Sequence, residues 1–285
     1  MKVIFFGEDS FSAVVLDSLI LAKHDVLAVV CPFYKNNIHS RLELVCKKNK
    51  IEFSRIADVN SIGVQKYLEE LKPDLIIVCH FQKILKKNII KIPVMGCINL
   101  HPSLLPYYRG MSPQHWPIIN GDNKTGITVH FIDEGVDTGD IILQQQVEIN
   151  PDMYVFDLQI EMMKIYKEIV KKSLDLLLNK KIKFIKQNNL GGSYYGRLKK
   201  TQCIIDIDGD HINAYNLIRG VSNPYFGAKL NGYVIWRAEV ADEKLNFKIQ
   251  NDYKRNNIYI DSKYGDFIKF TKGTLIIKKY DKLKS

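Results

Sequence analysis

An asparagine and a histidine stand two positions apart in the stretch CINLHPSLLPYYRG, which covers residues 97–110. On an extended strand, residues two apart point to the same side, so Asn99 and His101 would present their side chains together. An amide can donate a hydrogen bond to a developing oxyanion, and an imidazole can accept or pass on a proton. The pattern therefore indicates proton-transfer chemistry at the point where a buried strand gives way to a loop.

A second loop, DEGVDTGD at residues 133–140, offers two carboxylates to this pair. If the loop folds over the same edge of a sheet, Asp133 or Asp137 could reach His101, fix its tautomer and stabilise its charged form. No serine or cysteine stands where a nucleophile would be needed, so direct attack by a group of the substrate is the simpler chemistry. The alternative is that Asn99 and His101 make only local hydrogen bonds.

Other kinds of site have little support. The sequence GEDSFS after the first apolar run lacks GxGxxG, and no GxxxxGK[ST] occurs, which argues against dinucleotide and P-loop sites. The histidines are dispersed without HxxH or HExxH, so no metal site is predicted. His80 and His130 lie within apolar strands and are interpreted as core residues. Five scattered cysteines without a CxxC pair fit a reduced, cytoplasmic protein.

The first half of the chain alternates strand-like and helix-like segments. Strands are predicted at residues 2–6, 25–31, 51–53, 74–79, 96–100, 126–132 and 140–149. Helices are predicted at residues 11–23, 43–50, 61–72 and 153–180, the last with Asp152 as its N-cap. Continuous apolar strands separated by helices predict an α/β fold with a mostly parallel sheet covered on both faces.

The second part of the chain differs in composition and in its predicted secondary structure. Residues 180–200 carry seven lysines and arginines and no acidic residue, which is typical of a basic linker. A helix at residues 211–221 and several short strands follow, and they predict a small β-rich C-terminal domain. The predicted domains are therefore residues 1–185 and 186–285.

The net charge of +10 fits either an anionic partner or many solvated lysines. A nucleic acid, a membrane surface or a phosphorylated small molecule would each suit this charge. No apolar run approaches the roughly 18 residues of a membrane span. The five-residue apolar run near the N-terminus is also too short for a signal peptide. We expect a cytoplasmic protein without a membrane partner.

The segment INLHPSLLPYYRGMSPQHWPIINGDNKTGITVHFIDEGVDTGDIILQ, residues 98–144, resembles the core of the 10-formyltetrahydrofolate-dependent formyltransferases. The family pattern N-x-H-x-S-L-L-P-x-x-R-G, followed by a D-x-G-D-x-G type loop, is met at nearly every position. Weaker similarity extends over residues 1–19 and 212–228. The resemblance implies a Rossmann-like catalytic domain, N-formyltransferase activity and 10-formyltetrahydrofolate as the formyl donor.

The resemblance also carries roles over to particular residues. Asn99 and a protonated His101 would stabilise the negative oxygen of a tetrahedral intermediate, and Asp137 would hold His101 and raise its pKa. The folate pocket would be formed by Ile84, Leu85, Ser103, Leu104, Leu105, Pro106, Asp133, Gly135 and Val136. Within that pocket, residues 80–82 read His-Phe-Gln, where the family usually has a small or tyrosine-glycine type sequence.

Family members differ in the amine that they formylate. Methionyl-tRNA formyltransferases carry a longer insertion rich in glycine, arginine and lysine after the second strand, whereas residues 31–48 here are short and lack glycine. Residues 193–208 and 216–236 look more like the branch that acts on nucleotide-linked amino sugars. We expect a homodimer that formylates a TDP- or UDP-linked 4-amino-4,6-dideoxyhexose for a surface polysaccharide such as the lipopolysaccharide O-antigen.

In that interpretation the basic residues meet a diphosphate, and nucleic acid is not the expected partner. The predicted substrate contacts are Arg109, Gly110, Arg197, Lys199 and Tyr225. The alternative function is that of a methionyl-tRNA formyltransferase, for which the positive charge would serve the tRNA backbone.

Overall fold

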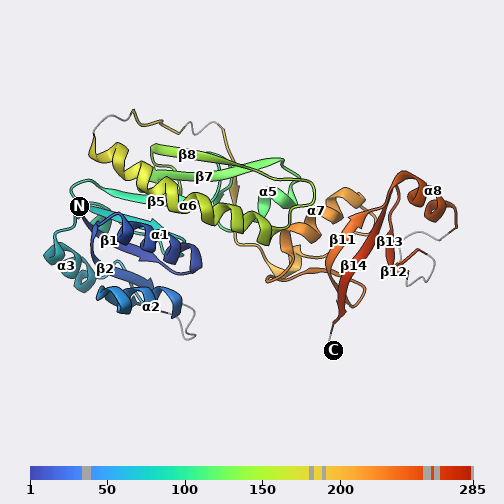
Figure 1. The fold of residues 1–285 in the computed structure, drawn as a ribbon, viewed down its shortest axis with the longest axis horizontal. Coiled ribbons are helices and arrows are strands. Elements are labelled where there is room, and N and C mark those ends of the chain that lie inside the picture. The colour runs from blue at the N-terminus through green and yellow to red at the C-terminus, as the bar shows by residue number, and fades with distance from the viewer. Residues whose placement is uncertain (34–39, 180–182, 188–190, 253–257, 260–263, 284–285) are drawn as a thin grey trace. The chain divides into compact units, whose positions relative to one another are not determined.

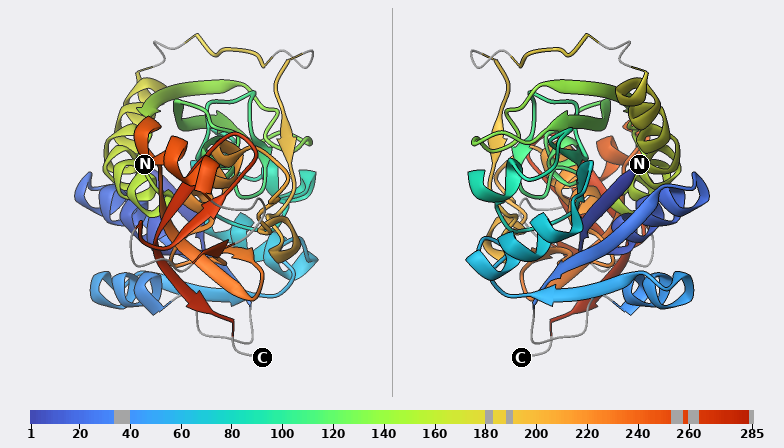
Figure 2. Two further views of the ribbon diagram at one scale, coloured as in Figure 1. Left: turned by 90° about the vertical axis from the view of Figure 1, so that its right-hand side faces the viewer. Right: turned by 90° about the vertical axis from the view of Figure 1, so that its left-hand side faces the viewer.

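A computed structural model describes residues 1–33, 40–179, 183–187, 191–252, 258–259 and 264–283 of the chain. Its largest sheet has seven strands in the order β3-β2-β1-β4-β5-β7-β8 (Figures 1 and 2). The strands from β1 to β5 run parallel, and β7 pairs antiparallel with β5. This confirms the predicted α/β fold with a mostly parallel sheet. The bounds are β1 (Lys2–Gly7), β2 (Asp25–Pro32), β3 (Glu52–Ile56), β4 (Leu75–Cys79), β5 (Cys97–His101), β7 (Lys124–Phe131) and β8 (Ile141–Glu148).

Helices cover this sheet. They are α1 (Ser10–Leu21), α2 (Ser40–Asn49), α3 (Ile62–Leu71), α4 (Lys87–Ile90) and α6 (Val155–Leu178). The short helix α5 (Trp116–Ile119) instead contacts α7 (His211–Val221). One face of the sheet packs on α3 and α4, where Leu68 and Ile89 are fully buried with Ile4 and Ile76. In Figure 1, α1 and α6 cross in front of the sheet. The apolar strands are thus buried by helices, as their lack of polar alternation predicts.

The start of α6 differs from the prediction. The helix begins at Val155, and the Asp152 carboxylate accepts a hydrogen bond from the Tyr215 hydroxyl at 3.4 Å. The side chain of Asp157 accepts from the Tyr154 backbone N–H at 3.0 Å. Asp152 is therefore not the N-cap, because it lies three residues before the first residue of the helix.

The C-terminal region holds a five-stranded sheet in the order β10-β11-β14-β13-β12, with antiparallel pairing throughout. Its strands are β10 (Ala228–Leu230), β11 (Tyr233–Val240), β12 (Ile258–Tyr259), β13 (Phe267–Lys269) and β14 (Thr274–Lys282). The helices are α7 (His211–Val221), as predicted, and α8 (Glu243–Asp252), which was not predicted. A short 3-10 turn covers Lys200–Gln202, and β9 (Tyr194–Tyr195) pairs with β6 (Arg109–Gly110).

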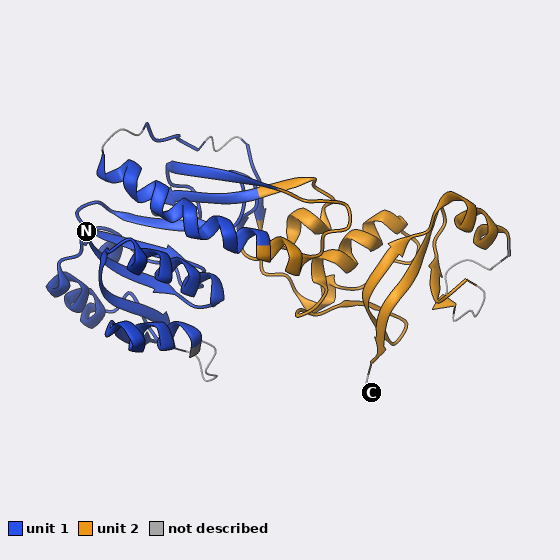
Figure 3. Ribbon diagram, in the orientation of Figure 1, with its two compact units in different colours: residues 1–110, 126–147, 161–194 blue, residues 111–125, 148–160, 195–285 orange. Residues whose placement is uncertain are grey.

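The chain divides into two compact units, shown in Figure 3. Unit 1 consists of residues 1–110, 126–147 and 161–194, and unit 2 of residues 111–125, 148–160 and 195–285. Each unit therefore combines segments that are distant in sequence. The predicted division into domains of residues 1–185 and 186–285 stays a prediction. In the part of the chain that the structure describes, no helix is long and apolar enough to cross a membrane.

Candidate active site

The carboxyl ends of the parallel strands β1, β4 and β5 meet at one edge of the large sheet. Ligands of open α/β sheets bind outside this edge. The last residues of β5 include Asn99 and His101, and the connection between β7 and β8 brings Asp137 to them. The predicted folding of this loop over the end of β5 is therefore observed, within unit 1 alone.

Asp137 lies at the centre of the cluster. Its Oδ1 is 3.7 Å from His101 Nδ1, 3.6 Å from His130 Nε2 and 3.4 Å from the Asn99 amide nitrogen. Its Oδ2 accepts a hydrogen bond from the backbone N–H of Gly110 at 2.9 Å. Of Asp133 and Asp137, the two candidates in the loop, Asp137 is thus the one that reaches His101.

Asp133 shapes the loop instead. Its Oδ1 accepts hydrogen bonds from the Gly135 backbone N–H at 3.0 Å and from the Thr138 hydroxyl at 2.6 Å. A side chain at Gly135 would come within 2.0 Å of Thr138 Oγ1, so the turn needs glycine there. Asp137 itself has a φ of 53°, a left-handed conformation that aspartate tolerates better than most residues. These local contacts aim the Asp137 carboxylate at β5.

The tautomer of His101 follows from its partners. His101 Nε2 lies 2.8 Å from the carbonyl oxygen of Tyr108, and a carbonyl can only accept, so Nε2 carries the proton. Nδ1 is then the atom that can accept a proton, and it faces Asp137. The ring is buried, with only 4% of the residue exposed. His101 is therefore oriented as a proton acceptor beside a carboxylate.

Burial lowers the pKa of His101, and the raising effect of Asp137 does not offset it. We predicted a raised pKa and a protonated ring, and the net direction is the opposite. The reason is that desolvation in the buried pocket penalises the imidazolium more than one carboxylate stabilises it. The resting ring is accordingly neutral near pH 7, which suits a general base.

Asp137 is ionised. Burial by itself would raise the pKa of this carboxyl group. His101, His130 and the N–H of Gly110 outweigh that effect and hold the pKa well below its ordinary value. The site therefore combines a permanent negative charge with a neutral imidazole and an amide donor. A proton taken up by His101 Nδ1 would be stabilised at once by the carboxylate.

His130 belongs to this cluster, which the sequence did not reveal. It was interpreted as a core residue, and it is indeed buried, with 1% exposed. In the antiparallel pairing of β5 with β7, His130 stands directly opposite Asn99. Its Nε2 lies 3.3 Å from the Asn99 amide nitrogen, while Nδ1 donates to the Phe131 carbonyl at 2.7 Å. Only the register of the two strands could have placed His130 in the site.

Arg109 and Gly110, predicted to contact substrate, hold the catalytic loop. The Arg109 guanidinium donates to the Asp137 carbonyl at 3.1 Å and to Gln187 Oε1 at 2.8 Å. Gln187 in turn donates to the carbonyls of Asp137 at 2.9 Å and Gly139 at 2.8 Å. Gln187 lies in the segment that was interpreted as a linker, and no motif marks it. Both side chains fix the backbone that carries Asp137.

The residues expected around the folate fall into two groups. Leu85, Ser103 and Leu105 are buried and support the walls of the expected folate pocket. Leu104 and Pro106 are half-buried. By contrast, 71% of Ile84 and 41% of Val136 are exposed. Exposed apolar side chains on the two loops offer surface to a flat aromatic ring, so the residues present fit a pterin.

The departure at residues 80–82 has a structural role. His80 follows β4 with a φ of 49°, and its ring stacks on Phe11 with centroids 4.6 Å apart. Its Nδ1 lies 2.8 Å from the Asp9 carboxylate and its Nε2 2.9 Å from the Tyr166 hydroxyl. His80 is thus a satisfied residue, as interpreted. It joins the end of β4 to α1 and α6.

Three predicted substrate contacts belong to unit 2. Arg197 and Lys199 are exposed, and Tyr225 is half-buried. The Tyr225 hydroxyl accepts a hydrogen bond from Gln159, and its ring packs edge-on against His115 at 4.4 Å between centroids. The three predicted contacts belong to unit 2, whereas Asn99, His101 and Asp137 belong to unit 1. Their role in substrate binding stays a prediction.

Known proteins resemble this chain in sequence. A methionyl-tRNA formyltransferase of Alkaliphilus oremlandii is 35% identical over 254 residues, covering 86% of this chain and 82% of that protein. A methionyl-tRNA formyltransferase of Fusobacterium nucleatum is 30% identical over 286 residues, covering 97% of this chain and 91% of that protein. The similarity therefore extends across both compact units.

Solved structures resemble it in fold. An N-formyltransferase from Helicobacter canadensis, in complex with folinic acid and dTDP-3-aminofucose, has a TM-score of 0.77 at 22% identity over 99% of this chain and all of that one. A 4-N formyltransferase from Francisella tularensis has a TM-score of 0.62 at 25% identity over 99% of this chain and 98% of that one. Residues 1–172 match the formyl transferase family model. The chain, with Asn99, His101 and Asp137 clustered at its sheet edge, belongs to the formyltransferase family.

Proposed function

We propose that this enzyme transfers the formyl group of 10-formyltetrahydrofolate to the amino group of a nucleotide-linked amino sugar. The observation that carries the chemistry is the arrangement of an ionised Asp137 3.7 Å from a neutral, buried His101, with Asn99 beside them. Such a cluster can remove a proton from an attacking amine and stabilise a developing oxyanion.

In this reaction the lone pair of the amine forms a bond to the formyl carbon. The carbonyl oxygen becomes negative, and the Asn99 amide N–H is the available side-chain donor to it. The bonds of this amide to His130 and Asp137, at 3.3 and 3.4 Å, are long and therefore weak, so exchange for an oxyanion costs little. His101 Nδ1 takes the proton of the amine and passes it to the leaving nitrogen of the donor as the carbon–nitrogen bond breaks.

The donor is supported by the solved relatives and by the pocket. The H. canadensis enzyme was crystallised with folinic acid, a formylated tetrahydrofolate. Here the exposed Ile84 and Val136 are on the two loops that the family resemblance places against the pterin. No covalent intermediate on the protein is needed, because the amine attacks the formyl carbon directly.

The acceptor is proposed to be a TDP- or UDP-linked 4-amino-4,6-dideoxyhexose of a bacterial surface polysaccharide, bound by a homodimer. Only seven residues, 33–39, separate the end of β2 from the start of α2. Methionyl-tRNA formyltransferases, by the family resemblance, carry a longer basic insertion there. The fold similarity to the F. tularensis 4-N formyltransferase supports the same choice.

Methionyl-tRNA is the second candidate acceptor. It is favoured by the sequence identity of 30 to 35% to the two methionyl-tRNA formyltransferases described above, over most of their length. The net charge of +10 also suits a nucleic-acid backbone. The chemistry at Asp137 and His101 is the same for both acceptors, so the acceptor is decided by binding outside this cluster.

A competition assay separates the two acceptors. The enzyme and 10-formyltetrahydrofolate are offered a panel of TDP- and UDP-linked amino sugars, and in parallel charged initiator methionyl-tRNA. We expect the formyl group on a sugar nucleotide. Formylation of the tRNA alone would overturn the proposed acceptor. A His101→Asn variant serves as the inactive control, since it removes the base but keeps a polar side chain of similar size.

A further inference from the structure

The chain that leads into β9 runs alongside the loop that follows β5. Gly192 has a φ of 102°, and a side chain there would come within 2.2 Å of the Pro106 carbonyl oxygen, so glycine allows this close approach. The next residue, Ser193, donates its N–H to the Pro106 carbonyl at 3.2 Å and accepts from the Arg109 N–H at 2.9 Å. The backbone alone therefore fixes the position of Ser193 beside the loop.

The side chain of Ser193 bonds to Tyr108. Its Oγ accepts a hydrogen bond from the Tyr108 backbone N–H at 2.9 Å. Tyr108 has a φ of 59°, a left-handed conformation that a tyrosine keeps only where its surroundings hold it. In this conformation the Tyr108 carbonyl accepts the hydrogen bond of His101 Nε2 at 2.8 Å. Two hydrogen bonds of one residue therefore connect Ser193 to the buried imidazole.

Two acceptors compete for the single ring proton of the neutral His101. One is the Tyr108 carbonyl, 2.8 Å from Nε2, and the other is the Asp137 carboxylate, 3.7 Å from Nδ1. A separation of 3.7 Å is too long for a hydrogen bond, so the proton stays on Nε2 and Nδ1 is left to accept. If the Tyr108 carbonyl turned away, the carboxylate would be the better acceptor and the proton would move to Nδ1. The ring would then no longer take a proton from an amine at Nδ1.

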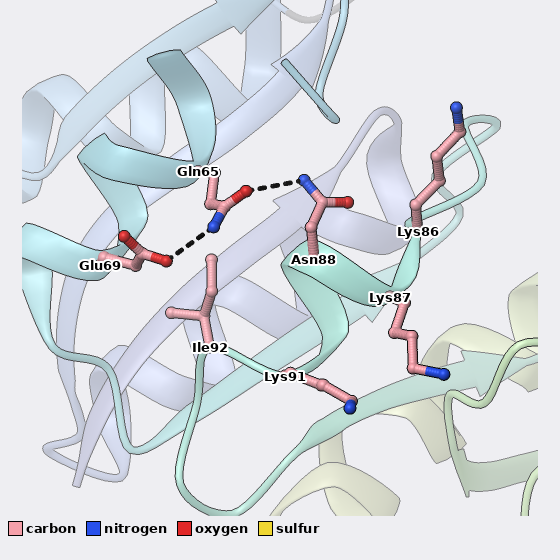
Figure 4. Close-up of a pocket in the computed structure, with 7 residues that line it drawn as sticks. All are labelled: Gln65, Glu69, Lys86, Lys87, Asn88, Lys91 and Ile92. Carbon is pink, nitrogen blue, oxygen red and sulfur yellow. Dashed lines mark hydrogen bonds between the residues drawn. The ribbon is translucent and has the colours of Figure 1, made fainter. Parts of the chain in front are cut away.

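The same part of the chain also holds the loop that carries the carboxylate. Gln187, six residues before Ser193, donates to the Asp137 carbonyl at 2.9 Å. On its outer side the loop has an ion pair between Glu134 and Lys87, a residue that lines the cavity shown in Figure 4. Both side chains of this pair are more than half exposed, so it contributes little. The orientation of the cluster therefore depends on Gln187 and Ser193 more than on this surface pair.

We propose that Ser193 is a positioning residue that sets the tautomer of His101 through the Tyr108 carbonyl. Ser193 does not touch the reacting atoms. It holds the residue whose carbonyl keeps the proton on Nε2, and it thereby keeps Nδ1 able to accept the proton of the amine. The inference rests on the proposed role of His101 as the base of formyl transfer, and it is independent of which amine is formylated.

The test is the nitrogen NMR spectrum of the enzyme with isotope-labelled histidines, recorded without donor or acceptor. The chemical shifts of the two ring nitrogens show which of them carries the proton, and the spectrum of His101→Asn identifies the signals of His101. We expect the natural enzyme to carry the proton on Nε2. In Ser193→Ala the tautomer equilibrium should shift about tenfold toward Nδ1, the size that one hydrogen bond gives. Ser193→Thr keeps a hydroxyl and should restore the natural spectrum.

The same variants are assayed for formyl transfer with the acceptor that the competition assay identifies. Ser193→Ala should lower kcat about tenfold and change the KM for the donor less than about twofold. Burial lowers the pKa of His101, and the bond to Tyr108 acts in the opposite direction. Loss of this bond should therefore move the acidic midpoint of kcat/KM to lower pH. The other charged groups that act on the ring are unchanged in this variant, and they are Asp137, His130 and His80.

Ser18→Ala is the matched control. Ser18 is a buried serine of unit 1 whose hydroxyl donates to the Val14 carbonyl of its own helix at 3.0 Å. Its replacement removes one hydrogen bond far from the loop in sequence, and it should leave the tautomer, kcat and the pH midpoint unchanged.

A Ser193→Ala enzyme that keeps the His101 proton on Nε2 would overturn the proposal. So would a lower kcat and melting temperature with the natural tautomer and pH midpoint, because Ser193 would then be only structural. If Ser193→Ala does not fold, Ser193→Cys, whose sulfur is a weak acceptor, serves the same test. The NMR measurement needs no substrate, so a shifted tautomer would support the role of Ser193 even if the natural enzyme formylated none of the amines offered.

Discussion

Replacing Asp137 by asparagine removes the charge of the cluster and little else. The carbonyl oxygen of the new side-chain amide can still accept the hydrogen bond of the Gly110 N–H, so the loop should keep its path. Two unit charges 3.7 Å apart, at an effective dielectric constant of about 20, attract each other by about 4.5 kcal/mol. Without this attraction the imidazolium formed during proton transfer is no longer stabilised. At about 1.4 kcal/mol per factor of ten, the formyl transfer rate should fall about a thousandfold.

The assay is single-turnover formyl transfer with saturating donor and acceptor, accompanied by a titration with 5-formyltetrahydrofolate. We expect the transfer rate to fall while donor affinity changes less than about threefold, since the pocket walls are untouched. An Asp25→Asn variant, which neutralises an exposed carboxylate of the same unit, should behave like the natural enzyme. A rate within about tenfold of the natural enzyme would refute the idea that Asp137 stabilises a protonated His101.

Three further outcomes are expected. Because burial lowers the pKa of His101, the neutral base is lost only at acidic pH. We therefore expect kcat/KM to stay level at neutral pH and to fall with a midpoint below the ordinary histidine pKa of 6.5. A midpoint above that value would contradict a neutral resting ring. His80→Leu leaves the buried Tyr166 hydroxyl without its hydrogen-bond partner. The free energy of unfolding, measured by urea denaturation, should fall by about 1–3 kcal/mol. An unchanged denaturation midpoint would show that this hydrogen bond contributes nothing to stability. A methyl group at Gly139 would lie 1.9 Å from the carbonyl oxygen of Phe131. Gly139→Ala should therefore reduce both the activity and the melting temperature. Normal values for both would mean that the loop can shift without loss of activity or stability.

Local patterns predicted the parts of the site that depend on one segment. The Asn-x-His spacing placed two side chains on one face of β5 because strand alternation is a property of the strand itself. The spacing alone left the choice between Asp133 and Asp137 open, and only the family resemblance indicated Asp137. The choice depends on the turn at Gly135 and on the left-handed backbone at Asp137. The loop path, and not the spacing, decides which carboxylate reaches the ring.

Properties that arise from strand pairing and side-chain packing could not be predicted from local sequence patterns. His130 enters the site through the register of β7 against β5, which no local pattern encodes. Gln187 fixes the loop from a segment without a motif. The pKa of His101 was predicted in the wrong direction because the resemblance supplied the neighbouring charge and not the depth of burial. The structure brings Asn99, His101 and Asp137 together as predicted, but their electrostatic balance depends on the complete fold.

Segments that pack together in unit 1 are synthesised at different times on the ribosome. Tyr166 of α6 is fully buried and bonds to His80, yet residues 161–194 emerge long after β1, β4 and β5. At roughly 5–20 residues per second, about 5–20 s pass between the synthesis of His101 and that of residue 194. During this interval the apolar strands lack α6, and their uncovered face is a binding surface for chaperones. The nascent chain should therefore depend on chaperones until α6 has left the exit tunnel.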